Sequence, residues 1–388
     1  MSMNHSDRFP RGQAAIVSAE TDCMGAAPGF TAMEMAARAS VKALSAVNLT
    51  PADVDGLFVC MPRDFVSGLA LAEYLGIRPR ITNNNRVGGS SFQTYMASAA
   101  LALASGQCDV ALVAYGSNQR SASGKLVTSI EGSPYEAPYK PLTPATAYAL
   151  AASRHMHQYG TTREQMAQVA VAARQWAQLN PEAFMREPLT VEECLAARMV
   201  STPLTVRDCC LVTDGAAAMV MTRGERAKDL CIKPVYILGA AEATRHRHIS
   251  MAPDVTVTAA ADSGPRAMAQ AGVRHSDIDL LTLYDAFTIN TILFLEDLGF
   301  CPKGEGGRFV EGGRIAPGGS LPVNTNGGGL SCVHPGMYGL FALVEAAQQL
   351  MGRCGERQIP GAELALSHGN GGELSSQATV ILGTEATL

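Results

Sequence analysis

Residues 53–60 read DVDGLFVC, and residues 277–284 read DIDLLTLY. Each stretch pairs an Asp-x-Asp turn with a short apolar run of the kind that forms a buried strand. Each also follows a stretch of helical character, and Asp277 follows Asp53 by 224 residues. The chain therefore contains a duplication, and we expect its two halves to share one fold.

The other parts of each half follow in the same order. The matching pairs are the strands AAIVSAE (14–20) and PVYILGAAE (234–242), the turns NNNRVGGSSF (83–92) and VNTNGGGLSC (323–332), the helices 91–105 and 335–351, and the strands DVALVAYGS (109–117) and ELALSHGNGG (363–372). Strands that alternate with helices predict an α/β fold with a mostly parallel sheet covered on both faces.

A segment between the halves, 120–205, does not fit the repeat. It begins with the Pro-rich SPYEAPYKPLTPA and continues with helical spacing of apolar residues. A connection this long inside a compact unit is typical of a lid or binding loop. The strand DGAAAMVM (214–221) then returns to the first half, with Asp214 expected to accept backbone N–H groups. The predicted organisation is 1–119 with 206–228 as the N-terminal half, 120–205 as the insertion, and 229–388 as the C-terminal half.

Composition restricts the class of protein. The 388 residues are 47% hydrophobic and 17% charged, which is typical of a compact α/β protein. The net charge of −5 and the lack of basic runs argue against nucleic acid and anionic membranes as partners. The polar N-terminus MSMNHSDRFPRG does not resemble a signal peptide, and no apolar run is long enough to span a bilayer. Ten cysteines without a C-x-x-C pair predict reduced thiols in a cytoplasmic protein, and no metal-ligand spacing is present.

Five motifs resemble the thiolase superfamily, over essentially the whole chain. They are VGGSSFQTYMASAALALASGQCDVALV (87–113), DGAAAMVM, LYDAFT (283–288), NGGGLSCVHPGMYG (326–339) and TREQMAQVAVAARQWAQLNP (162–181). The resemblance implies the duplicated, five-layered αβαβα thiolase fold, with 120–205 as its loop domain. The sequence of residues 283–313 is most similar to sterol-carrier-protein-type thiolases and to lipid-transfer-type thiolase-like proteins. Some of those relatives are thioester aldolases that shorten steroid side chains, and members often pair with a small OB-fold protein.

The resemblance places the acyl-accepting cysteine of a thiolase in the first Gly-rich turn. Gly88 falls at that position, and a one-residue slip would select Val87 or Gly89, so no nucleophile is present. Ser90 and Ser91 favour helix capping, with a serine nucleophile as the alternative. The backbone N–H groups of Gly88, Gly89 and Ser90 are predicted to form an oxyanion hole for a thioester, the alternative being a tight turn without ligand. Gly328 and Gly371 complete the predicted ligand-binding set.

The acid/base groups come from the second half. His334 matches the histidine of the family's Gly-His-Pro motif and is expected just ahead of a helix, where the neutral ring would donate to a thioester oxygen. His368 stands at or beside the position of the family's second cysteine and is a candidate proton carrier. The alternative for both is a structural histidine.

The family's Asn-Glu pair is replaced by Tyr284 and Asp285. A phenol can donate to an oxyanion or carry a proton, and Tyr338, four residues after His334, is placed to face the same space. Either tyrosine can also be core. Cys332 is a candidate substitute acid/base, although a buried small hydrophobe is the default for such a residue.

Without the thiol, thiolysis fails at its first covalent step. The predicted reaction is retro-aldol cleavage, or aldol addition, of a β-hydroxyacyl-CoA without an acyl-enzyme, with His334, Tyr284, His368, Tyr338 and Asp285 as the catalytic set. The alternatives are acyl transfer through Ser90, Ser91 or Cys332, and a non-catalytic acyl-CoA carrier. Coenzyme A enters as part of the substrate, with no other cofactor. The insertion and Gly304–Gly313 are expected to line its channel, and a homodimer with a small OB-fold (zinc-ribbon) partner follows from the resemblance.

Overall fold

The computed structural model describes residues 9–123 and 133–388. The first eight residues of the N-terminal segment and nine residues of the insertion lie outside this description. The strands are β1 Ala14–Gly25, β2 Gly56–Val59, β3 Ile81–Asn83, β4 Val110–Ser117, β5 Met199–Ser201, β6 Leu204–Thr205, β7 Asp214–Arg223, β8 Val235–Thr244, β9 Leu280–Leu283, β10 Leu364–Gly371 and β11 Ser376–Gly383. The helices are α1 Ala32–Ser45, α2 Ser67–Leu75, α3 Ser91–Ala104, α4 Gln119–Ser123, α5 Ala145–Tyr159, α6 Arg163–Gln178, α7 Val191–Ala196, α8 Gly224–Leu230, α9 Ala260–Ala271, α10 Thr288–Asp297, α11 Gly306–Phe309 and α12 Gly339–Met351.

Nine strands form one continuous sheet in the order β3-β2-β4-β7-β1-β8-β11-β10-β9. The prediction of a mostly parallel sheet is wrong. Only β2–β3, β2–β4 and β9–β10 are parallel, whereas the other five pairings are antiparallel. The reason lies in two connections: β11 follows β10 through a tight turn, and β7 enters from the long insertion. Neither is the helical crossover that a parallel pair requires.

The duplication predicted from the sequence is present in atomic detail. The Asp55 carboxylate accepts from the main-chain N–H groups of Asp109 and Val110, and so ties β2 to the start of β4. Asp279 accepts from Glu363 and Leu364 in the same way, and so ties β9 to β10. The partner of β9 that would correspond to β3 is reduced to a single parallel bridge between Leu281 and Val323.

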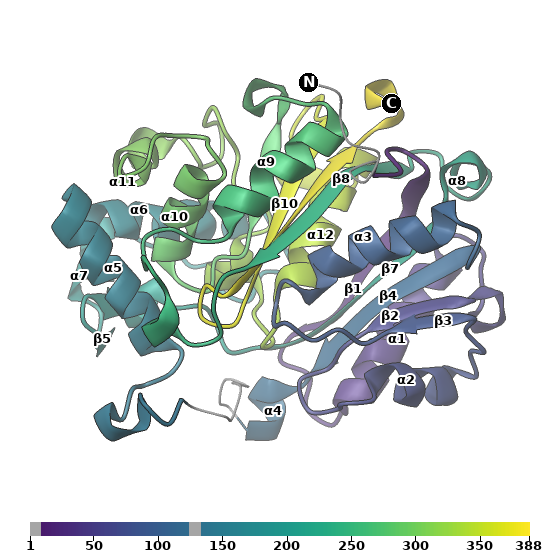
Figure 1. Cartoon of the computed structure of the whole chain (residues 1–388), viewed down its shortest axis with the longest axis horizontal. Coiled ribbons are helices and arrows are strands. Elements are labelled where there is room, and N and C mark those ends of the chain that lie inside the picture. The colour runs from purple at the N-terminus through teal and green to yellow at the C-terminus, as the bar shows by residue number, and fades with distance from the viewer. Residues whose placement is uncertain (1–8, 124–132) are drawn as a thin grey trace.

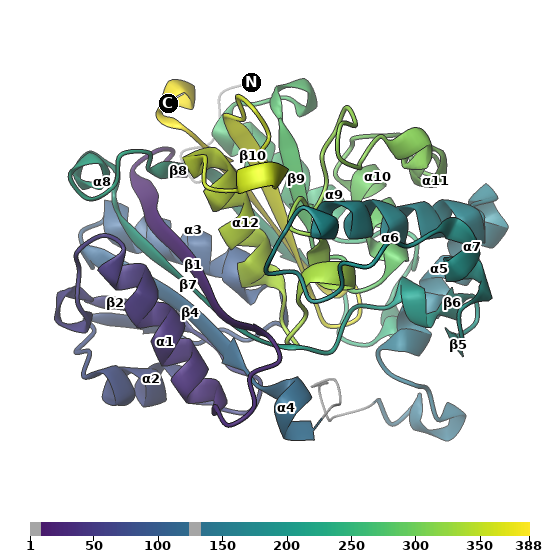
Figure 2. The ribbon, with the colours of Figure 1, turned by 180° about the vertical axis from the view of Figure 1, so that it is seen from behind.

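Helices α3 and α12 occupy the middle of the molecule. Both pack against strands of the two halves, while α1 and α2 cover the first half from outside and α9 covers β8 and β11. Figure 1 shows α3 and α12 between the strands of the first half (β1–β4 and β7) and those of the second half (β8–β11). Figure 2 shows α1 on the outer face of the first-half strands, away from α3. This is the five-layered arrangement that the resemblance to the thiolase superfamily implies. The Gly-rich turns that precede α3 and α12 therefore meet at the centre.

The insertion packs beside the second half rather than over the first. Its helix α6 contacts α10 and the turn that precedes α12, and α5 also contacts α10 (Figure 2). Thr162 and Gln165 form a capping box at the start of α6, as polar residues at these two positions favour. Within the described residues, no helix is both long enough and apolar enough to cross a membrane.

Candidate active site

Two glycine turns, one from each half, are in contact at the start of α3. A Cβ added to Gly88 would lie 2.7 Å from Gly371 Cα and 2.8 Å from Gly372 N, and one added to Gly371 would meet Val87 O and Ser90 Oγ. Only glycine permits this approach. Among the described hydrogen bonds, none uses the N–H of Gly88, Gly89 or Ser90 as a donor. These three N–H groups therefore have no hydrogen-bond acceptor within the described residues.

The turn before α3 carries no activated nucleophile. The Ser90 hydroxyl donates to Ser376 Oγ at 3.0 Å, and the Ser91 hydroxyl donates to Gly88 O at 2.7 Å while accepting from Val87 N–H. Neither serine accepts a first-turn N–H of α3, so the expected capping interaction is wrong, and neither has a histidine beside it. A hydroxyl without an adjacent base is a poor acyl acceptor.

His334 follows a short π-helical turn, Gly328–Cys332, and precedes α12 by five residues. The expected helix 335–351 begins only at Gly339, because Pro335 and Gly336, whose φ is +95°, break the backbone path. Gln119 Nε2 donates to His334 O at 2.6 Å, and His334 N–H donates to Thr213. Burial, not a helix terminus, lowers the pKa of the imidazole to about 4. The ring is therefore neutral at pH 7.

Tyr284 is the partner of that ring. Its hydroxyl oxygen lies 3.2 Å from His334 Nε2 and accepts from Tyr338 N–H at 3.2 Å. Either group can donate in this contact, depending on which ring nitrogen carries the proton; with the ring proton on Nδ1, the hydroxyl donates to Nε2. Nδ1 is buried and has no hydrogen-bond partner among the described residues. Burial raises the pKa of Tyr284 well above its usual value, so the group is a neutral phenol.

The Tyr284 ring also lies against the turn formed by Gly88, Gly89 and Ser90, which we call the donor turn. A Cβ on Gly89 would lie 2.5 Å from Tyr284 Cζ and 2.7 Å from its hydroxyl oxygen. Tyr338 packs edge-on to Tyr284 and parallel to His334, and its own hydroxyl donates to Asn326 Oδ1 at 3.0 Å. The structure thus brings Tyr284, His334 and Tyr338 together beside Gly89, with Tyr338 presenting its main-chain N–H rather than its hydroxyl to Tyr284.

Asp285 lies beneath the π-helical turn and is fully buried. Its Oδ1 accepts from Gly329 N–H at 2.6 Å, and its Oδ2 has no partner within the described residues. Burial raises the pKa of this carboxyl to about 7, with the Gly329 N–H acting in the opposite direction. Gly328, expected to bind ligand, instead faces this carboxyl: a Cβ there would lie 2.7 Å from Asp285 Cγ. Both residues shape the turn that presents His334.

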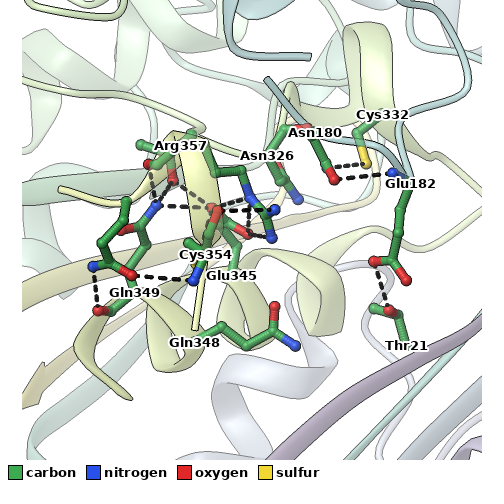
Figure 3. Close-up of polar contacts among 12 residues, drawn as sticks. Thr21, Asn180, Glu182, Asn326, Cys332, Glu345, Gln348, Gln349, Cys354 and Arg357 are labelled. Carbon is green, nitrogen blue, oxygen red and sulfur yellow. Dashed lines mark hydrogen bonds and ion pairs between the residues drawn. The ribbon is translucent and has the colours of Figure 1, made fainter. Parts of the chain in front are cut away.

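Buried polar contacts fix that turn from behind (Figure 3). Asn180, from the insertion, donates to Asn326 O at 2.9 Å and to Cys332 Sγ at 3.5 Å. Thr325 donates to Glu345 on α12, which forms a buried ion pair with Arg357. Cys332 is held inside this network, and burial raises the pKa of its thiol far above the usual range, so it is neither a nucleophile nor an acid at neutral pH.

His368 does not join the cluster. Side chains alternate along β10, so His368 points away from α3, while Gly369 faces it: a Cβ on Gly369 would lie 2.6 Å from Gln93 Cδ. Both ring nitrogens of His368 are hydrogen-bonded, Nδ1 to Thr379 and Nε2 to Gln377. Burial lowers its pKa to about 4. The assignment of His368 as a proton carrier is therefore not supported by its position.

Sequence reasoning missed Cys210 as a neighbour of the site. Its N–H donates to Ala286 O at 2.8 Å. Burial raises the pKa of its thiol well above the usual value, the charge of Asp285 raises that pKa further, and ionisation of the thiol would raise the pKa of Tyr284. The neighbouring Cys209 pairs with Phe287 in an antiparallel bridge, which carries Cys210 to the site. The run DCC gave no signal of this, because the contact depends on a strand pairing distant in sequence.

Comparison with known proteins gives a consistent result. A family model described as "Thiolase C-terminal domain-like" matches residues 241–384. The 17-hydroxy-3-oxo-4-pregnene-20-carboxyl-CoA lyase of Mycobacterium tuberculosis is 34% identical over 88% of this chain and 92% of its own length. An acetyl-CoA acetyltransferase of Methanothermobacter thermautotrophicus is 33% identical over 87% and 91%. The solved structure of the Ltp2-ChsH2(DUF35) aldolase superposes with a TM-score of 0.89 at 31% identity, covering 97% of this chain and 98% of that chain.

Proposed function

The chain belongs to the thiolase superfamily and is a thiolase-like carbon–carbon lyase, and we propose that it cleaves a β-hydroxyacyl-CoA thioester by a retro-aldol reaction in which Tyr284 and His334 move the proton. The observation that carries this proposal is the pairing of the Tyr284 hydroxyl with a neutral His334 ring, beside a donor turn without a nucleophile.

The substrate thioester oxygen would accept from the free N–H groups of the Gly88–Ser90 turn and from His334 Nδ1–H, which has no partner in the described structure. These donors stabilise negative charge on that oxygen as an enolate forms. Donors of this kind each contribute about 3 kcal/mol to barrier lowering when they are well placed.

The β-hydroxyl proton would pass to the Tyr284 oxygen as the phenolic proton moves to His334 Nε2. The Cα–Cβ bond then breaks, its electron pair forms the thioester enolate, and the β-carbon leaves as a ketone or aldehyde. Return of the proton from His334 through Tyr284 to Cα gives the shortened acyl-CoA. Because the phenol has a high pKa, this relay needs no free phenolate.

Acyl transfer through a covalent intermediate is the second candidate, because one of the similar proteins is an acetyl-CoA acetyltransferase. The hydrogen bonds of Ser90 and Ser91 and the burial of Cys332 argue against each nucleophile that the sequence offers. A non-catalytic acyl-CoA carrier is disfavoured by the buried contact between the Tyr284 hydroxyl and the His334 ring, because binding alone does not need an acid–base pair.

Partners follow by analogy with the solved aldolase, which contains a DUF35 protein. We propose that this chain acts as a homodimer with a small partner of that type, and that coenzyme A enters only with the substrate. The insertion and Gly304–Gly313 are proposed to line its channel. The ten cysteines, none of which forms a disulfide, fit the reducing cytoplasm that we propose as its location.

The test is an assay of the purified chain, alone and with a co-expressed DUF35-type partner, on β-hydroxyacyl-CoA thioesters of increasing acyl size. Release of a ketone or aldehyde together with a shortened acyl-CoA is expected. Turnover of β-ketoacyl-CoA with free CoA, and none of the β-hydroxy thioester, would instead establish thiolysis and reject the proposal.

A further inference from the structure

His368 belongs to an unbroken line of buried hydrogen bonds that we call the β10–β11 polar chain. Its members are Ser263, Thr379, His368, Gln377, Asn370, Tyr148 and the Gly372 carbonyl. Successive donor–acceptor distances from Ser263 onward are 3.0, 2.9, 2.8, 2.7, 2.8 and 3.0 Å. The six side chains are at most 2% exposed. The chain starts on α9, crosses β11 and β10, and reaches α5 of the insertion.

The direction of every bond in this chain is fixed by its last member. A carbonyl can only accept, so the Tyr148 hydroxyl donates to Gly372 O and accepts from the Asn370 amide. Asn370 Oδ1 then accepts from Gln377 Nε2, which leaves Gln377 Oε1 to accept from His368 Nε2–H. His368 Nδ1 accepts from Thr379. Aligned hydrogen bonds of this kind strengthen one another in a low-dielectric interior.

The end of the chain touches the active site on two sides. Gly372 N would lie 2.8 Å from a Cβ on Gly88, so the β10–β11 polar chain ends in the Gly371–Gly372 turn that packs directly against the donor turn. The Tyr148 ring stacks on Phe287 with centroids 4.3 Å apart, and Phe287 follows Asp285 by two residues. A shift of Tyr148 would therefore displace both the donor turn and the segment that carries Tyr284.

We propose that His368 is a positioning residue: as the neutral, Nε2-protonated centre of the β10–β11 polar chain, it holds Tyr148 and the Gly371–Gly372 turn in place, and through them the Gly88–Ser90 donors. This inference rests on the proposed function for its kinetic consequence only. It also means that the insertion, through α5, and the donor turn are coupled by a single directional path.

The first test uses Tyr148→Phe, which deletes one oxygen and leaves the stacking on Phe287. Hydrogen–deuterium exchange of the segments 86–92 and 370–376 should become about tenfold faster, because the Gly371–Gly372 turn that packs against the donor turn loses its hydrogen bond from Tyr148. The matched control is Tyr236→Phe, at a buried tyrosine in β8 outside the chain, which should leave these segments unchanged. Unchanged exchange in Tyr148→Phe would overturn the proposal whether or not the protein cleaves any thioester.

The second test separates position from packing. Gln377→Glu keeps the size of the side chain but turns its donor into an acceptor, so Asn370 must reverse and Tyr148 must donate to it instead of to Gly372. In an active enzyme, kcat should fall about tenfold with KM within twofold, and the combination with Tyr148→Phe should cost no more than either change alone. His368→Gln, which keeps a donor toward Gln377, should retain activity that His368→Leu loses. Additive losses, or equal activity of these two His368 variants, would reject the directional chain.

Discussion

The Tyr284 hydroxyl stands between a main-chain donor and a neutral imidazole: its oxygen accepts from Tyr338 N–H at 3.2 Å and lies 3.2 Å from His334 Nε2. In the mechanism that we propose, the phenol in this position receives and releases a proton without becoming a stable anion. On this proposal the pair transfers protons to and from a β-hydroxyl, and the turn before α3 offers no thiol on which to hold an acyl chain.

Removal of the Tyr284 hydroxyl should therefore stop the relay and leave the substrate site in place. We expect Tyr284→Phe to lower kcat for β-hydroxyacyl-CoA cleavage by about 10²- to 10⁴-fold, with KM little changed, because general acid–base catalysis contributes factors of this size. Steady-state kinetics of ketone release measures both constants. Tyr236→Phe is the control for a buried tyrosine, and an unchanged kcat in Tyr284→Phe would remove this residue from the mechanism.

A methyl group at Gly89 should disable the same pair by displacement. The backbone of Gly89 is not in the left-handed region, so alanine causes no backbone strain there, but its Cβ would lie 2.5 Å from Tyr284 Cζ. We expect Gly89→Ala to lower kcat at least about tenfold, while the overpacking against the buried ring costs about 1–3 kcal/mol of stability.

The contrasting variant is Gly76→Ala. Gly76 has φ +71° at the end of α2 and faces open space. Alanine there should cost about 1 kcal/mol of stability and leave kcat unchanged. Loss of activity in both variants in proportion to their stability would show that the effect at Gly89 is general destabilisation.

Protonation of His334 should appear in the stability of the protein. Its pKa is lowered from 6.5 in the unfolded chain to about 4 in the folded protein, so between these pH values only the unfolded state binds the proton. The resulting stability is present above pH 6.5 and is lost as the pH falls through 4. Relative to His334→Gln, the wild type should lose about 3 kcal/mol over this range.

Urea unfolding at pH 7, 5.5 and 4.5 measures this difference. His157→Gln, at an exposed histidine on α5, is the control. A wild-type and His334→Gln difference that does not vary with pH would mean that the imidazole is not buried in its neutral form.

Much of the fold could be predicted because the duplication is visible in short residue patterns that recur in both halves. Asp55 and Asp279 each directly precede an apolar run. In its own half, each carboxylate accepts from main-chain N–H groups at the start of the neighbouring strand. Strand direction could not be predicted in this way, since alternating strands and helices do not reveal that β11 returns through a tight turn. The distinction between His334 and His368 was also hidden: one lies on an irregular turn, and a shift of one residue on β10 decides which face the other occupies.

The same limit applies to Cys210, whose contact with the site depends on the pairing of Cys209 with Phe287. Ionisation of its thiol would raise the pKa of Tyr284 further, and a test at this thiol separates the two reaction classes. If the reaction is retro-aldol, Cys210→Ser should keep kcat within about threefold of the wild type, since serine preserves size and the thiol is not ionised at neutral pH. Intact mass after incubation with several acyl-CoA donors should show no adduct. An acyl group retained by the wild type and absent from Cys210→Ser would identify a displaced nucleophile, and the lyase mechanism would have to be abandoned in favour of acyl transfer.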